Sequence, residues 1–190
     1  MDVALVKLFG SQERVKILRL FLANPSNLFA SAEVAKRTKI RSTANNRELL
    51  NLHSIGFLLK KTTGKIKHWQ LNPNFLFLSP LRQILRDDFG GRKKELVRQL
   101  SRCGRLLLLI VSGVFIEEKD SRTDLLIVGL NLKNALLERV IRNLEAELGR
   151  ELNYSVLDRE EFLYRVTSGD RFIRDVLDYP HQVVVKKINF

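Results

Sequence analysis

The side chains with the clearest chemical potential lie in the polar segment that begins at Ser42. The amide of Asn46 can make paired hydrogen bonds with adenine, and the guanidinium of Arg47 can do the same with guanine. The hydroxyls of Ser42 and Thr43 can reach a phosphate or a base edge. The alternative is that Arg47 forms an ion pair with Glu48 or another neighbour while Asn46 only meets solvent. Of the two interpretations, we favour contact with nucleic acid.

A helix must position these side chains. Over Ser42–Ile55 the apolar residues recur at helical spacing, and Leu49, Leu52 and Ile55 fall on one side. Gly56 then ends the segment. The amide and guanidinium named above point elsewhere, so the pattern predicts a helix with one polar face.

Two shorter helical patterns precede this helix, over Ser11–Ala23 and Ser31–Lys39. The first is mostly apolar and is interpreted as scaffold. The second turns Val34 and Ala35 inward and its charges outward. We interpret those charges as phosphate contacts, and the alternative is that they only solvate a surface. The basic residues predicted to contact DNA in and after this pattern are Lys36, Arg37, Lys39 and Arg41.

Two short runs of apolar and basic residues follow, and they predict a β-hairpin. They are joined by residues 62–65, where Gly64 supplies the positive φ that the turn needs. Trp69 alternates with polar neighbours, so we expect it to pack on the helices instead of stacking on a base. Lysines gather near the tip, where charge contacts with phosphates are expected. These residues are Lys60, Lys61, Lys65 and Lys67.

The order helix, helix, helix, hairpin, with SAEVAKRTKIRSTANNRELLNLHSIGFLLKK as its most telling part, resembles the winged helix-turn-helix family. The resemblance covers residues 1–74. Related sequences have a Ser/Thr-rich start and then an Arg-Glu-Leu step, matched here by residues 42–44 and 47–49. Asn45 stands at the position between them that is usually apolar. The resemblance implies double-stranded DNA as the partner, read by the third helix with support from the hairpin, or wing.

The charge is unevenly distributed, which agrees with this interpretation. The formal net charge is +12, and residues 1–72 hold 13 Lys and Arg against 4 Asp and Glu. Such an excess attracts a polyanion through phosphate contacts and counterion release. Neither a membrane span nor a signal peptide is evident, so we expect a cytoplasmic protein with no membrane partner. A single cysteine, Cys103, cannot build an internal disulfide or a zinc site.

The second half alternates strands and helices around one small sheet, so the fold class is predicted to be α+β with two domains. A linker helix is expected over residues 75–91, with a break at Gly90-Gly91, and a second domain over 92–190. A helix at 92–103 leads into an apolar run from Leu106 that suits a strand buried on both faces. The later predicted elements are strands at Thr123–Gly129 and Glu151–Leu157, and helices at Leu132–Leu148, Arg159–Val166 and Asp170–Leu177.

The segment IVSGVFIEEKDSRTDLLIVG resembles the minimal nucleotidyltransferase family of the polymerase-beta-like superfamily. In that family a Gly-Ser pair at a strand end precedes an Asp-x-Asp step, and a third Asp comes from a later strand. The carboxylates hold Mg²⁺ ions that bridge the triphosphate. Here Gly113 is followed by Val114, and Arg122 stands in place of the first Asp. Asp124 matches the second, and Asn153 lies near the third.

A guanidinium at a metal-ligand position brings a fixed positive charge to the metal site. We therefore expect a degenerate site that has no catalytic residues, no metal and no cofactor. An Arg122–Asp124 ion pair is expected in its place, with Asp120 as a displaced ligand the alternative. Two alternatives stay open for the pocket. Val114 and that ion pair simply close it, or it binds a nucleotide weakly without a metal.

Together these patterns predict a sequence-specific DNA-binding transcriptional regulator. Its second domain would serve in ligand sensing, dimerisation or partner docking, so a homodimer, a nucleotide and a protein stay open as further partners. One alternative is an active nucleotidyltransferase that the winged helix brings to a nucleic acid. Another is an antitoxin-type interaction protein, since minimal nucleotidyltransferases often pair with a toxin of another fold.

Overall fold

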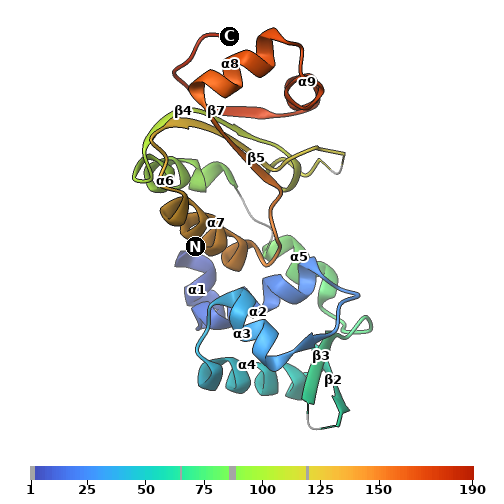
Figure 1. Ribbon diagram of the computed structural model, residues 1–190. Helices are drawn as coiled ribbons and strands as arrows, with labels where there is room; N and C mark the ends of the chain where they lie inside the picture. The colour runs from blue at the N-terminus through green and yellow to red at the C-terminus, as the bar shows by residue number, and fades with distance from the viewer. Residues whose placement is uncertain (1–2, 65, 86–88, 119) are drawn as a thin grey trace. The chain divides into compact units, whose positions relative to one another are not determined.

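Figure 1 shows the computed structural model, which describes residues 3–64, 66–85, 89–118 and 120–190. Over these residues the chain forms nine α-helices and two sheets, so the predicted α+β class is confirmed. The chain divides into two compact units. The first contains Met1–Arg86 and Arg142–Glu151, and the second contains Asp87–Ile141 and Leu152–Phe190.

The helices of the first unit begin and end at residues suited to those places. Ser11 caps α2, because its Oγ accepts a hydrogen bond from the backbone N–H of Arg14 at 3.1 Å. Lys39 ends α3 in the left-handed conformation, and Gly56, with φ of 80°, follows α4. The elements are α1 Val3–Phe9, α2 Gln12–Ala23, β1 Phe29–Ala30, α3 Ser31–Thr38, α4 Ser42–Ser54, β2 Leu58–Thr63, β3 Ile66–Leu71 and α5 Leu78–Ile84.

The predicted hairpin is confirmed and forms most of the first sheet. Its strands run antiparallel, in the order β1-β3-β2, and Thr63 pairs with Ile66 across a two-residue turn. Gly64 has φ of 61°, as the turn requires. The strand β1 adds to the other edge of β3, with Phe29 opposite Trp69. Neither β1 nor α1 was predicted from the sequence.

The core of the first unit lies between α2, α3, α4 and the sheet. Part of the stretch predicted as a linker helix belongs to it, because Leu85 is buried there and Phe75, Leu78 and Leu81 pack against it. Burial of these side chains removes apolar surface from water and so holds α5 to the unit. The largest fully buried core residues of this unit are Trp69, Phe21, Phe29, Phe57, Ile17, Leu20, Leu49, Leu58 and Leu71.

The second unit confirms the predicted alternation and adds a final strand, β7. The break expected at Gly90-Gly91 is wrong, since α6 begins at Phe89 and includes both glycines. Glycine weakens a helix by about 1 kcal/mol, but the later turns of α6 are anchored by buried Leu96 and Leu100. The elements are α6 Phe89–Ser101, β4 Arg105–Val111, β5 Leu125–Leu130, α7 Asn134–Leu148, β6 Tyr154–Asp158, α8 Arg159–Thr167, α9 Arg171–Asp178 and β7 Gln182–Lys186.

The second sheet is mixed, with strand order β6-β5-β4-β7. β4 pairs antiparallel with β5 and β7, and β5 pairs parallel with β6. The helix α7 lies in the crossover connection between β5 and β6. The helices α8 and α9 lie on one face of the sheet and α6 on the other (Figure 1). Six of the seven β4 residues are therefore buried, as predicted for a strand covered on both faces. A 3-10 turn, Gly113–Phe115, follows β4.

Among the described residues, no helix has the length and the apolar composition that crossing a membrane would require.

Candidate nucleic-acid interface

The polar face of α4 is open to solvent. Ser42, Thr43, Asn46 and Arg47 are all exposed, while Leu49 and Leu52 are buried in the core. Ile55 does not follow them inward as the periodicity predicts. It is the C-cap residue, lies outside the helix proper with φ of −89° and ψ of 2°, and is 62% exposed. The helical period therefore no longer applies to it.

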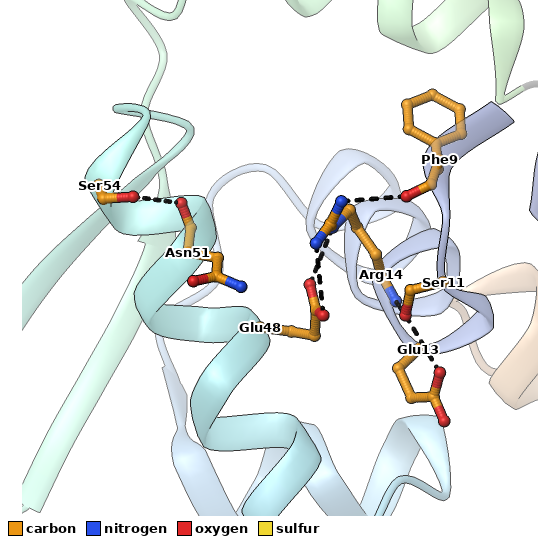
Figure 2. Close-up of polar contacts among 7 residues, drawn as sticks. All are labelled: Phe9, Ser11, Glu13, Arg14, Glu48, Asn51 and Ser54. Atoms are coloured by element: carbon orange, nitrogen blue, oxygen red, sulfur yellow. Dashed lines mark hydrogen bonds and ion pairs between the residues drawn. The ribbon is translucent and has the colours of Figure 1, made fainter.

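Glu48 and Arg14 form the ion pair that fixes the inward face of α4. The Glu48 carboxylate accepts from Arg14 Nε at 2.8 Å, and Arg14 Nη1 donates to the carbonyl of Phe9 at 3.0 Å (Figure 2). The Glu48 side chain is only 3% exposed. The alternative in which Arg47 pairs with Glu48 is therefore wrong. Neighbouring residues on a helix point in different directions, so Glu48 faces α2 while Arg47 faces outward.

Asn45 also faces inward, at the position where related sequences have an apolar residue. Its side chain is buried, and Nδ2 donates to the carbonyl of Ser31 at 2.9 Å. Its Oδ1 has no hydrogen-bond partner among the described residues. The buried amide thus joins the start of α4 to the start of α3.

The start of α2 contributes an acidic neighbour to this surface (Figure 2). Glu13 accepts from its own backbone N–H and from the Ser11 hydroxyl at 3.1 Å, and these hydrogen bonds hold its pKa below the usual value. The cations of Lys16 and Arg47 lower the pKa of Glu13 further. A phosphate that approaches Arg47 therefore meets a carboxylate nearby.

The basic residues of α3 differ in their surroundings. Lys36 is exposed. Arg37 is half-buried, pairs with Glu33 at 3.0 Å and stacks over Phe29 at 5.2 Å from the ring centroid. Lys39 is exposed and adopts φ of 54° at the end of the helix. Arg37 and Lys39 are therefore already engaged, since Lys39 Nζ donates to Asn143 Oδ1 at 2.7 Å, and exposed Lys36 is the better placed to meet a phosphate.

The N-terminal turn of α4 receives no hydrogen bond from its N-cap side chain. Arg41 holds the N-cap position in an extended conformation and is exposed. The backbone N–H groups of a first turn attract anions when no side chain satisfies them. Arg41 and this uncapped first turn thus lie at the same end of α4.

The wing lysines fall on both faces of the hairpin. Lys60 lies opposite Trp69 and its Nζ sits 5.9 Å from that ring, while Lys67 lies two residues before Trp69 and shares its face. Lys61 lies opposite His68 on the other face and donates to Gln70 at 3.2 Å. Lys65, the fourth predicted wing residue, lies outside the described residues.

Trp69 packs on the helices, as predicted. It is 2% exposed, and its Nε1 donates to the hydroxyl of Ser31 at 2.8 Å. The ring of His53 meets it edge-on at 5.8 Å between centroids. Trp69 therefore anchors the hairpin to α3 and α4 and is closed to stacking with a base.

The residues of the second unit that were predicted to form a degenerate site are brought together in part. Asp124 is buried, and its two carboxylate oxygens accept from the backbone N–H of Val114 at 2.9 Å and of Asn153 at 2.8 Å. Gly113 has φ of 53°, and a Cβ added there would collide with Asp124 Oδ1. Asp124 thus connects the turn after β4 to Asn153, the residue that precedes β6.

The expected Arg122–Asp124 ion pair is wrong. Arg122 Nε instead donates to Asp175 Oδ2 on α9 at 2.9 Å, because backbone N–H groups already occupy both oxygens of Asp124. Arg171 approaches the same Asp175 oxygen at 4.0 Å. A shallow pocket of about 240 Å³ lies here, lined by Arg122, Arg171, Phe172 and Asp175.

No group of three or more His, Cys, Asp or Glu side chains within the described part of the chain is arranged to hold a metal ion.

Sequence reasoning missed two residues that shape these sites. Arg14 was treated as part of a scaffold helix, and its partner lies 34 residues away, beyond any local pattern. Asp175 was placed in a helix without a role. Its spacing of four residues from Arg171 was the available signal for an ion pair there.

Comparison of the chain with models of protein families, with curated proteins and with solved structures found no match.

Proposed function

We propose that this protein is a sequence-specific transcriptional regulator whose first unit is a winged helix-turn-helix domain that binds double-stranded DNA. The observation that supports this best is the outward face of α4. Asn46 and Arg47 are exposed there, while Asn45 and Glu48 turn inward to partners in the unit. Amide and guanidinium groups on an exposed helix are the usual means of reading adenine and guanine in the major groove.

The neighbouring elements support the same proposal. α3 and α4 are joined by residues 39–41, as two helices of a helix-turn-helix are joined by a short turn. The hairpin follows directly, with exposed Lys60, Lys61 and Lys67. In this proposal α4 enters the major groove while Lys36 of α3 and the wing lysines contact phosphates.

We propose that the second unit is a nucleotidyltransferase-like domain without transferase activity, used for ligand sensing, dimerisation or partner docking. Both carboxylate oxygens of Asp124 accept hydrogen bonds from backbone N–H groups, and Arg122 places a cation where a second carboxylate would be needed. Two-metal transfer needs several carboxylates. Incubation with labelled nucleoside triphosphates, Mg²⁺ and DNA or protein acceptors is expected to yield no labelled product, and a Mg²⁺-dependent product would refute this part.

The DNA proposal is tested by selecting bound sequences from a random pool of duplexes. A defined motif is expected to emerge. Arg47→Ala and Asn46→Ala should each cost about 1–3 kcal/mol on that motif and relax the preference at one base position. Arg82→Ala is the matched control, since it removes one exposed arginine from α5 of the same unit.

The control separates base reading from a general loss of charge. Arg82→Ala should leave both the affinity and the base preference unchanged. If Arg47→Ala behaved like Arg82→Ala and Asn46→Ala changed nothing, α4 would not be the reading element. If no motif emerged at all, sequence-specific binding itself would be wrong.

A further inference from the structure

An apolar pocket of about 520 Å³ opens in the first unit, behind the face of α4 that we assign to DNA. Its floor is formed by buried side chains, Leu18, Leu52 and Phe57, and its mouth by Ile55 and Phe77. The volume lies within the roughly 300–1,000 Å³ typical of small-molecule sites. The other described residues that line it are Phe9, Arg14, Asn51, Ser54, Phe75 and Leu81.

The aromatic wall of the pocket is held in a fixed arrangement. Phe57 meets Phe75 edge-on at 5.5 Å, and Phe75 meets Phe77 in the same way at 5.8 Å. The backbone beneath them is tied by hydrogen bonds from Phe75 N to Asn72 O and from Leu81 N to Phe77 O. Edge-to-face contacts of this kind favour one ring geometry. The wall is therefore preformed and aromatic.

The polar groups at the pocket wall suit an uncharged ligand. Arg14 is the charged residue among those that line it, and Glu48 neutralises it at 2.8 Å. The amide of Asn51 lies on the same helix as Glu48 (Figure 2) and has no hydrogen bond to another described side chain. The Ser54 hydroxyl donates to the carbonyl of Asn51 at 2.8 Å, which leaves its lone pairs as acceptors. One amide and one hydroxyl can thus orient a polar substituent.

We propose that this pocket binds a small, uncharged aromatic molecule that carries one hydrogen-bonding group. A second copy of the chain is a poorer fit, since Ile55 and Phe77 are the exposed large apolar residues among those lining it. Two such side chains fall short of a stable protein interface, which buries more than about 1,000 Å². The site goes beyond the DNA proposal, and its occupancy can be measured without DNA.

N-phenyl-1-naphthylamine is a suitable probe, because it is uncharged and aromatic, has one N–H, and fluoresces strongly when it leaves water. Titration of the full chain is expected to give saturable binding of one probe per chain. Phe77→Ala and Ile55→Ala should each weaken it by about fivefold or more, the factor for 1 kcal/mol of lost contact. Leu76→Ala is the matched control, since Leu76 is exposed and adjacent but outside the pocket.

Both substitutions act on exposed side chains, so the fold should persist, and far-ultraviolet circular dichroism checks this. Non-saturable binding, or equal affinity in all three variants, would overturn the proposal. Light scattering measures the oligomeric state and so tests a second copy of the chain as the occupant. A dimer that Phe77→Ala converts to a monomer, together with no probe binding, would show that a second copy fills the pocket and would also overturn it.

Discussion

At the scale of single residues, the buried carboxylate of Glu48 is expected to influence stability through its cationic partner. Its Oε2 lies 2.8 Å from Arg14 Nε, and the Glu48 side chain is 3% exposed. A charge that loses its partner inside a protein keeps its desolvation penalty. The ion pair is therefore expected to matter more than an exposed pair of the same type.

Arg14→Met should lower the free energy of unfolding by about 1.5–3 kcal/mol, the cost of losing a hydrogen bond to a charged group. Arg14→Met combined with Glu48→Met should recover part of the loss, because no charge is then left buried. The control is Arg98→Met, which breaks the exposed pair with Glu95 and should change little. Urea unfolding measures all three, and equal effects of Arg14→Met and Arg98→Met would contradict the prediction.

Cys103 gives a second prediction at this scale. The side chain is fully buried, and burial raises the pKa of its thiol. At neutral pH the thiol therefore stays protonated and should react slowly with an aromatic disulfide reagent in the folded protein, but rapidly in denaturant. The sign for stability is also set. The unfolded chain ionises first as pH rises past the usual thiol pKa, so stability falls there.

Rates of thiol modification, followed by absorbance across a pH series, provide the measurement. Equal rates in the folded and the denatured protein would mean that Cys103 is accessible.

The inward turn of Asn45 and Glu48 illustrates why buried polar residues escape sequence reasoning. Periodicity assigns polar residues to the solvent side, while the partners that satisfy them, Ser31 and Arg14, lie 14 and 34 residues away.

At the scale of elements, the wing lysines that share one face of the hairpin give a prediction about the salt dependence of DNA binding. Lys60 and Lys67 share the face of Trp69. Changing both to Gln should weaken binding to all DNA sequences alike. It should also make the negative slope of log affinity against log salt shallower by about 2. The control changes Lys133 and Lys187, two exposed lysines of the second unit, to Gln. An unchanged slope in the wing variant, or an equal change in the control, would place the wing away from DNA.

The turn after β4 supplies the second element-scale prediction. Asp124→Asn replaces an acceptor by an amide that must present an N–H group to a backbone N–H, so unfolding should become easier by about 1–3 kcal/mol. Asp120→Asn, at an exposed residue of the same loop, should have little effect. Thermal unfolding monitored by circular dichroism distinguishes the two. Stabilisation by Asp124→Asn would indicate instead a carboxylate held in strain for a ligand.

Elements with strong internal patterns were predictable, and those made by pairing were not. The buried run of β4 and the helix α4 follow from apolar content and period alone. β7 contains three consecutive valines, a strand signal that sequence reasoning overlooked, but its pairing with β4, with Val185 opposite Leu109, required the structure. β1 has two residues and exists through its pairing with β3. Contacts distant in sequence define such strands.

At the scale of the whole molecule, the charge is concentrated in the segment that includes the proposed DNA-binding elements. Residues 1–72 hold 13 Lys and Arg against 4 Asp and Glu, while residues 73–190 hold 20 against 17. Electrostatic attraction of a polyanion should therefore arise mainly from the first unit. The composition made this asymmetry visible at once, whereas the contact of Arg37 with the Phe29 ring required the structure.

The chain contains one tryptophan, Trp69, and it lies in the sheet of the first unit. Its indole donates to Ser31, meets the ring of His53 and lies under Lys60. Light absorbed by indole is thus emitted from this one place. This chain thus has its own optical reporter: the wavelength and yield of its emission should follow the melting of the first unit, or the arrival of a nucleic acid at the wing, without a dye.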